Sequence, residues 1–167
     1  MSEGTGRTHY VLHPSPVALL RLGSSGGALT HLWFVTPDSV VPDGWERGDP
    51  DGLLAEATRQ LDAYFARTLV RFDLPLAPSG TPFQQKVWAA LREIPLGRTV
   101  TYAELATQTG SGSRAVGGAN GANPVGIVIP CHRVVNTDGG LGGYAGGIDQ
   151  KRWLLRHEGA LQPALFG

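Results

Sequence analysis

The chain has 167 residues, of which 41% are hydrophobic and 17% charged, and its formal net charge is zero, a composition that excludes a disordered protein. Its single cysteine excludes an internal disulfide and a cysteine-rich structural zinc site. The first ten residues lack the apolar stretch of a signal peptide, and no segment is long and apolar enough to span a membrane. We therefore expect a cytoplasmic protein.

The charges are unevenly divided along the chain. Residues 1–78 hold six Lys/Arg and nine Asp/Glu, whereas residues 79–167 hold eight and five. A basic C-terminal half favours a polyanion such as DNA, although an ordinary scatter of surface charge explains so small an excess equally well.

The N-terminal half predicts strands followed by a helix. Residues 10–23 and 28–35 are rich in valine, leucine and aromatic residues, and the GSSGG sequence between them predicts a hairpin turn. Residues 36–52 predict a loop. In residues 53–68 the spacing of Leu54, Leu61, Tyr64 and Phe65 predicts an amphipathic helix.

Prolines and a glycine in the sequence FDLPLAPSG (residues 72–80) mark a domain boundary. We therefore expect an N-terminal domain over residues 1–78 and a C-terminal domain over residues 79–167.

The C-terminal half opens with clear signals for helix starts. Thr81 suits an N-cap, Pro82 the first helical position and Gln84 the reciprocal position of a capping box. A second helix is predicted with Thr101 as N-cap, Glu104 completing its box and Gly110 as terminator. After a short turn Ser113 is expected to cap a further helix, which gives the outline of a helix-turn-helix.

The second helix of this motif contains three glycines, Gly117, Gly118 and Gly121. Each costs about 1 kcal/mol in a helix interior relative to alanine. Close backbone approach to another helix, which is the commoner use of such glycines, or to a nucleic-acid groove would offset this cost. Arg114, at the start of the helix, is expected to be exposed and solvated.

The apolar run of residues 126–135 predicts a buried strand that enters and leaves the Pro-Cys-His step at Cys131. A glycine-rich loop follows over residues 136–147. The last helix is expected to be capped by Asp149 and to end at Gly159.

Cys131 is followed by two residues that could activate it, His132 and Arg133. A thiol reacts as its thiolate, and apolar burial alone raises its pKa. Neighbouring residues of a regular strand point to opposite faces, but Pro130 favours a turn there, after which His132 reaches the sulfur directly or through a water. Glu158 is a candidate to orient the imidazole.

On these residues alone three interpretations stay open. Cys131 is a buried structural residue, the nucleophile of a Cys-His-acid hydrolase, or a nucleophile that accepts a group from an alkylated partner.

The motifs in combination resemble the O6-alkylguanine-DNA alkyltransferases, also called methylated-DNA–protein-cysteine methyltransferases. The resemblance covers nearly all of residues 81–159 and rests on PCHRVV, RAVGGANGANP, GYAGG, WLLRHEG and TPFQQKVWAALREIPLGRTVTYAELA. It implies an α/β (α+β) protein. A small N-terminal α/β domain with an antiparallel, ribonuclease H-like sheet would precede a mainly helical C-terminal domain with a helix-turn-helix.

The resemblance implies direct-reversal DNA repair, in which the alkyl group of O6-alkylguanine is transferred irreversibly to Cys131. His132 would be the general base, acting through a water, and Glu158 would orient it. Tyr102 would donate a proton to the departing guanine. The nucleotide must leave the base stack before a nucleophile can reach its O6 substituent.

The resemblance also implies a minor-groove DNA surface and a pocket for the flipped base. Arg114 would enter the stack as an arginine finger, and Asn123 would join the helix-turn-helix to the active-site strand. The implied DNA-binding residues further include Ala115, Gly117, Gly118, Ala119 and Asn120. The implied pocket residues are Gly126, Val128, Tyr144, Ala145 and Gly146.

The partner implied is double-stranded DNA that contains O6-alkylguanine, bound by a monomer, with clustering of copies along DNA left open. No cofactor, metal or membrane is expected. The role of Arg133 stays open between a structural and a DNA-facing one. The alternative function is a helix-turn-helix lesion sensor or regulator in which the cysteine is structural.

Overall fold

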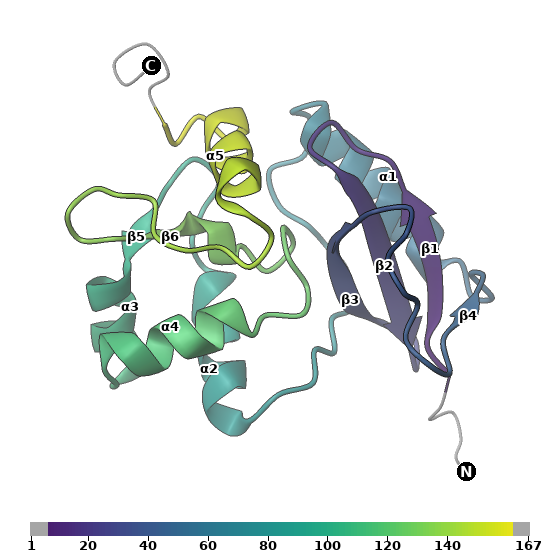
Figure 1. Cartoon of the computed structure of the whole chain (residues 1–167), viewed down its shortest axis with the longest axis horizontal. Coiled ribbons are helices and arrows are strands. Elements are labelled where there is room, and N and C mark those ends of the chain that lie inside the picture. Colours follow the sequence, from purple (N-terminus) through teal and green to yellow (C-terminus); the bar gives the residue numbers. More distant parts are fainter. Residues whose placement is uncertain (1–6, 162–167) are drawn as a thin grey trace. The chain divides into compact units, whose positions relative to one another are not determined.

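The computed structural model describes residues 7–161, and the chain divides into two compact units, Met1–Ser79 and Gly80–Gly167 (Figure 1). The first unit is a sheet with a helix against it, and the second consists mainly of helices. The fold is therefore mixed α/β, as the sequence predicts.

The first unit contains a four-stranded sheet with the order β3-β2-β1-β4. β2 pairs antiparallel with both β1 and β3, whereas the short β4 runs parallel to β1. Gly26 and Gly27, both with positive φ, form the predicted hairpin turn between β2 and β3. The strands are β1 (His9–His13), β2 (Leu19–Ser25), β3 (Ala28–Val35) and β4 (Glu46–Arg47). The prediction of a loop over residues 36–52 missed β4.

Helix α1 (Leu53–Phe65) packs against the sheet through the apolar stripe expected from its sequence. Leu54, Leu61 and Tyr64 are buried on α1, and Leu20 and Leu22 alternate along β2 so that both face the core.

The second unit begins with α2 (Pro82–Leu91), β5 (Val100–Thr101), α3 (Tyr102–Thr109) and α4 (Ser113–Gly121). Both predicted capping boxes are present, at the start of α2 and of α3, and Gly110 ends α3 with φ 71°. The expected cap by Ser113 is wrong. Gly112 is the N-cap, and Ser113 is already the first helical residue.

The apolar run before Cys131 is not a strand, which corrects the prediction for residues 126–135. Val128 N–H donates to Gly126 O at 2.7 Å across Ile127, which has φ 68°, and Cys131 N–H donates to Ile129 O at 2.8 Å. Two successive three-residue turns therefore replace a ladder. They lead into the 3₁₀ turn η2 (Cys131–Arg133) and the short strand β6 (Val134–Val135), which pairs parallel with β5.

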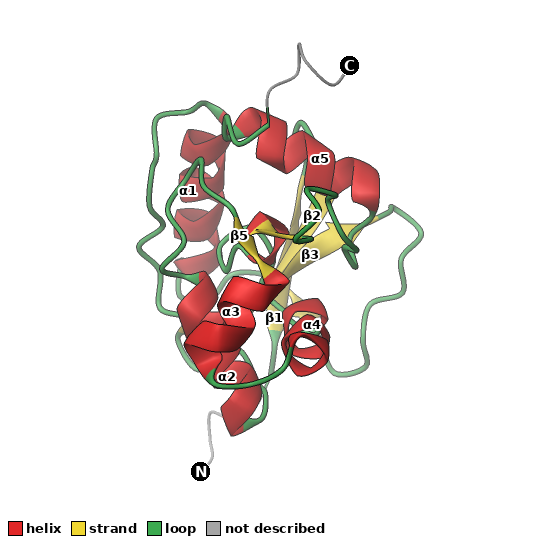
Figure 2. Ribbon diagram, turned by 90° about the vertical axis from the view of Figure 1, so that its left-hand side faces the viewer, coloured by secondary structure: helices red, strands yellow, loops and turns green. Residues whose placement is uncertain are grey.

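The last helix is α5 (Ile148–His157), and it starts two residues earlier than predicted. Gly147 is its N-cap, so Asp149 lies in the first turn, where it pairs with Arg152 instead of capping. Gly159, with φ 79°, follows the helix as expected. Figures 1 and 2 place the β5–β6 pair between α5 and the helices α2–α4. Within residues 7–161, none of the helices combines the length and hydropathy needed to cross a membrane.

Candidate active site

Cys131 is the first residue of η2 and is 2% exposed. Burial raises the pKa of its thiol to about 11, against smaller opposing effects of the Asn123 and Tyr144 side chains and of the charge on Lys151. The thiol is therefore protonated at neutral pH, and it requires a base before it can act as a nucleophile.

His132, the residue after the cysteine, is wholly buried, and one of its ring nitrogens is hydrogen-bonded to Glu158. Nε2 of His132 lies 2.7 Å from Oε2 of Glu158. Nδ1 is buried and has no hydrogen-bond partner among the residues that the structure describes, so a direct bond to the Cys131 sulfur is excluded. The geometry leaves Nδ1 for a bridging water, the second of the two routes that the sequence left open.

Arg133 is buried and fully engaged with protein groups, which favours the structural of the two roles left open by the sequence. It is 7% exposed, and its Nε and Nη2 donate to the two carboxylate oxygens of Glu158 at 2.8 and 3.1 Å. Its Nη1 donates to Ile94 O at 2.7 Å. Glu158 thus accepts from a histidine and an arginine at once. Burial raises the pKa of Glu158, but the charges and hydrogen bonds of His132 and Arg133 outweigh burial and hold that pKa well below its ordinary value.

Lys151 is a member of the site that the sequence reasoning missed. Its side chain is wholly buried, and Nζ donates to Val134 O at 2.7 Å and to Gly143 O at 3.1 Å. Burial lowers the pKa of Lys151 to about 8, although the nearby Cys131 raises it. The helical period could have predicted that Lys151 is buried, because it lies on the same face of α5 as the buried Leu154 and Leu155.

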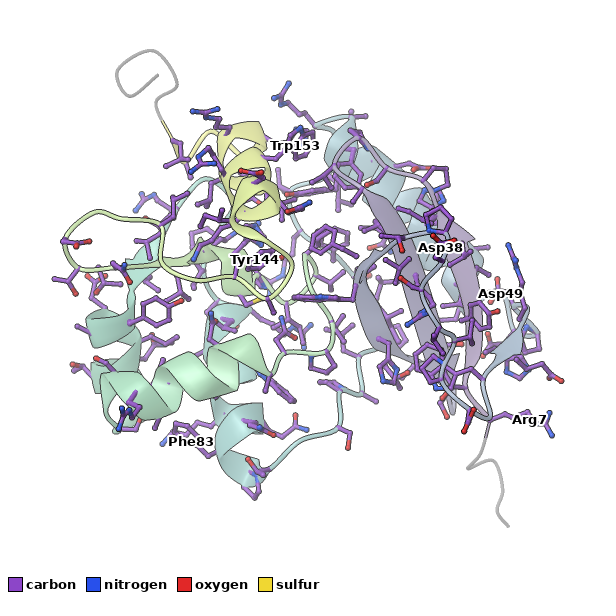
Figure 3. All side chains as sticks on the ribbon, in the orientation of Figure 1. Arg7, Asp38, Asp49, Phe83, Tyr144 and Trp153 are labelled. Atoms are coloured by element: carbon purple, nitrogen blue, oxygen red, sulfur yellow. The ribbon has the colours of Figure 1, made fainter. Side chains whose placement is uncertain are left out.

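Tyr102 and the glycine-rich loop complete the surroundings of the thiol. Burial raises the pKa of Tyr102, Cys131 raises it further, and a hydrogen bond with Asn120 lowers it. A Cβ added to Gly142, which has φ 77°, would lie 3.1 Å from Cε2 of Tyr102, so this loop position requires glycine. Figure 3 shows Tyr144 in the same loop, between β6 and α5.

The structure brings most of the predicted pocket residues near Cys131 in the fold. Gly126 and Val128 are buried in the turns that precede it, and Tyr144 is close enough for its side chain to lower the pKa of the thiol. Asn123 bridges the same segment, because its Nδ2 donates to Ile129 O at 2.8 Å and its Oδ1 accepts from Val125 N–H. Ala145 is exposed and Gly146 is partly buried.

Helix α4 has an exposed face of small residues. Arg114, Ala115 and Gly118 are exposed, and Gly117 is partly buried. A Cβ added at any of the three glycines of α4 would meet no described atom within 4 Å, which corrects the interpretation that they serve close packing inside the protein. Two of the expected DNA-facing residues are also corrected: Ala119 and Asn120 are each 4% exposed and lie on the inner face of the helix.

No group of three or more histidine, cysteine or carboxylate side chains within residues 7–161 is arranged to hold a metal ion. A buried thiol beside a histidine–carboxylate pair, next to a helix-turn-helix, is the arrangement expected of a DNA-binding protein with a nucleophilic cysteine.

Comparison with known proteins identifies the family. Residues 82–160 match the model of the 6-O-methylguanine DNA methyltransferase DNA-binding domain, and residues 8–78 match that of its ribonuclease-like domain. The chain belongs to the 6-O-methylguanine DNA methyltransferase family.

Relatives match over nearly the whole chain. The methylated-DNA–protein-cysteine methyltransferase of Methanosarcina acetivorans is 45% identical over 156 residues, which cover 91% of this chain and 99% of that protein. The enzyme of Mycobacterium tuberculosis is 45% identical over 159 residues, with coverages of 93% and 95%. The crystal structure of Mycobacterium tuberculosis OGT in complex with DNA matches with a TM-score of 0.83 and 44% identity, and the match covers 91% of this chain and 93% of that one.

Proposed function

We propose that this protein repairs DNA by transferring the alkyl group of O6-alkylguanine irreversibly to Cys131. The observation that carries the proposal is the buried thiol next to His132, whose Nε2 is held by Glu158 and whose Nδ1 faces no described partner. Such a histidine is oriented to take a proton from the thiol through one water.

The step balances without a cofactor. The Cys131 Sγ–H proton passes through water to Nδ1 of His132, and the sulfur lone pair attacks the alkyl carbon. An S–C bond forms and the C–O6 bond breaks, with its electron pair going to O6 of guanine. Tyr102 donates a proton to the departing base, and solvent returns a proton from the imidazolium to the tyrosinate. The product is a thioether, which has no leaving group comparable to the guanine anion, so each molecule acts once.

Buried groups around the site stabilise the negative charge that forms on the Cys131 sulfur and the positive charge that forms on His132. The ammonium of Lys151 and the side chains of Asn123 and Tyr144 all lower the pKa of Cys131 and so stabilise the developing thiolate. Glu158 stays ionised and stabilises the imidazolium that forms on His132. We propose that the protein acts as a monomer on double-stranded DNA and without a metal.

The exposed face of α4 suits the minor groove. It offers small residues and the exposed Arg114 to insert where the damaged nucleotide has left the stack. Such a surface reads few base edges, which suits a repair protein that must act in any sequence.

We expect Gly118→Ala to stabilise the protein and weaken its binding to DNA. Alanine gains about 1 kcal/mol of helix propensity, and its Cβ meets no described atom of the protein. The same methyl group would hold the helix backbone away from a groove. Thermal unfolding and the Kd for a duplex measure the two effects. Binding that improves together with stability would contradict the assignment of this face to DNA.

The proposed function is tested by incubating the protein with duplex DNA that carries isotopically labelled O6-methylguanine. We expect one label per protein molecule, and digestion should give a mass increase of one methyl group on the peptide that contains Cys131. Repeated turnover on an ester or amide without protein labelling would support the hydrolase interpretation instead.

A further inference from the structure

Asn120 lies inside the second unit, although the sequence placed it among residues that contact DNA. It is 4% exposed on α4, and its Nδ2 donates to Cys131 O at 3.3 Å. The helix is anchored at this level, because Trp88 Nε1 of α2 donates to Ala119 O at 2.9 Å. Asn120 is therefore a fixed polar group beside the cysteine, on the opposite side of α4 from the exposed residues.

The amide oxygen of Asn120 accepts no hydrogen bond from the described residues. Oδ1 is buried and has no partner within 3.5 Å among the described residues. A buried amide oxygen without a partner is costly, and it is retained where a ligand or a reacting group uses it. Tyr102 lies beside the same amide, because a side-chain hydrogen bond with Asn120 lowers the pKa of Tyr102, which is the direction expected when the amide N–H donates to the phenolic oxygen.

We propose that Asn120 is a positioning residue of the alkyl-transfer site. It fixes the Cys131 backbone through Nδ2 and holds the Tyr102 hydroxyl, so that the nucleophile and the proton donor face the same guanine. Asn120 thereby connects the DNA-facing helix α4 to both reacting groups. This inference rests on the proposed alkyl transfer and adds to it a residue that touches neither the alkyl carbon nor the DNA backbone.

The test is Asn120→Leu, which keeps the side-chain size and removes both polar atoms, made alone and together with Tyr102→Phe. Single-turnover methyl transfer from O6-methylguanine duplex should be about tenfold slower in Asn120→Leu, which is the effect of one net hydrogen bond. The Kd for the same duplex should stay within about twofold. In the Tyr102→Phe background the same replacement should slow transfer by less than about threefold, because the hydroxyl that Asn120 holds is gone.

Thr109→Val is the matched control. Thr109 is another buried polar residue of the helix-turn-helix, and its hydroxyl donates to Leu105 O at 2.8 Å. Its replacement removes a buried hydrogen bond without touching the cysteine or the tyrosine, so it should lower stability and leave the transfer rate unchanged. Asn120→Ala is measured in parallel, so that a folding defect specific to leucine does not decide the result.

The outcomes separate the inference from the function on which it rests. Transfer at the wild-type rate in both Asn120 variants overturns the inference, and so does an equal loss with and without the Tyr102 hydroxyl. Weaker DNA binding with an unchanged rate of the chemical step would return Asn120 to the DNA surface and overturn the inference as well. Absence of methyl transfer by the wild-type protein would overturn the proposed function itself.

Discussion

Cys131→Ser is expected to accept no methyl group from O6-methylguanine DNA, while its Kd for the same duplex stays within about twofold of the wild-type value. An alcohol is a far weaker nucleophile than a thiolate and is not ionised near neutral pH, so the chemical step is lost. Binding is kept because the exposed face of α4 lies on the other side of the helix from the cysteine. Protein-bound label and duplex affinity, measured on the same samples, give both numbers.

This variant separates the transferase from the alternative of a lesion sensor. A sensor with a structural cysteine would carry no label in either protein and would bind the lesion equally well in both. Label that persists in Cys131→Ser would place the acceptor elsewhere. Loss of DNA binding together with loss of label would mean that the serine disturbs the fold.

The same pair of proteins tests the burial of the thiol. Burial raises the pKa of Cys131 from 9.0 to about 11, so between these values the unfolded chain releases a proton that the folded protein retains. The wild type should therefore lose stability relative to Cys131→Ser as the pH rises from about 9 to about 11. Lys151, with its pKa lowered to about 8, contributes in the opposite direction in both proteins. Urea unfolding at several pH values measures the difference, and parallel curves would contradict the burial.

The helix starts of the second unit could be predicted because they depend on local chemistry. Thr81 with Gln84, and Thr101 with Glu104, satisfy backbone donors within a single turn, whatever surrounds the helix. The family likewise followed from motifs around Cys131, which are contiguous in the sequence.

The errors concern features that tertiary structure decides. The run before Cys131 has the composition of a strand, but it folds into turns with a positive φ at Ile127, a conformation that no propensity favours for a β-branched residue. Asn120 was placed on the wrong side of α4, although the buried Val116 lies one turn earlier on the same inner face and is the one large apolar residue of a helix built otherwise of small and polar residues. Lys151 was missed because lysine is ordinarily exposed, and the carbonyl groups that hold it come from other segments.

Glu158→Gln is expected to slow methyl transfer by about 10²- to 10⁴-fold, the range in which a positioned general base contributes to rate. Glutamine keeps the size of the side chain and one oxygen acceptor, but it removes the charge that stabilises an imidazolium on His132. In the wild-type protein the Arg133 guanidinium donates to both carboxylate oxygens of Glu158, and in the variant one of these oxygens is replaced by an amide NH₂ group. Single-turnover transfer kinetics give the rate, and the duplex Kd should be unchanged.

The variant should also change how stability depends on acid. The folded-state pKa of Glu158 lies below its ordinary value of 4.5, because the effects of His132 and Arg133 outweigh burial. Its contribution to stability is therefore complete above about pH 4.5 and is lost as the pH falls further. Glu158→Gln lacks this contribution. The stability difference between the two proteins should be largest near neutral pH and should shrink below pH 4.5.

A loss of rate in Glu158→Gln has to be distinguished from a loss of folded protein. Leaving a buried charge without its partner costs about 3–5 kcal/mol, and here the charge is that of Arg133. Leu61→Ala provides a control, because truncation of this fully buried leucine of the first unit costs about 2–5 kcal/mol far along the chain from the cysteine. At a temperature where both variants are folded by circular dichroism, Leu61→Ala should transfer at the wild-type rate. An equal slowing in the two variants would assign Glu158 a purely structural role, whereas slowing confined to Glu158→Gln makes it the residue that prepares His132 to deprotonate the thiol.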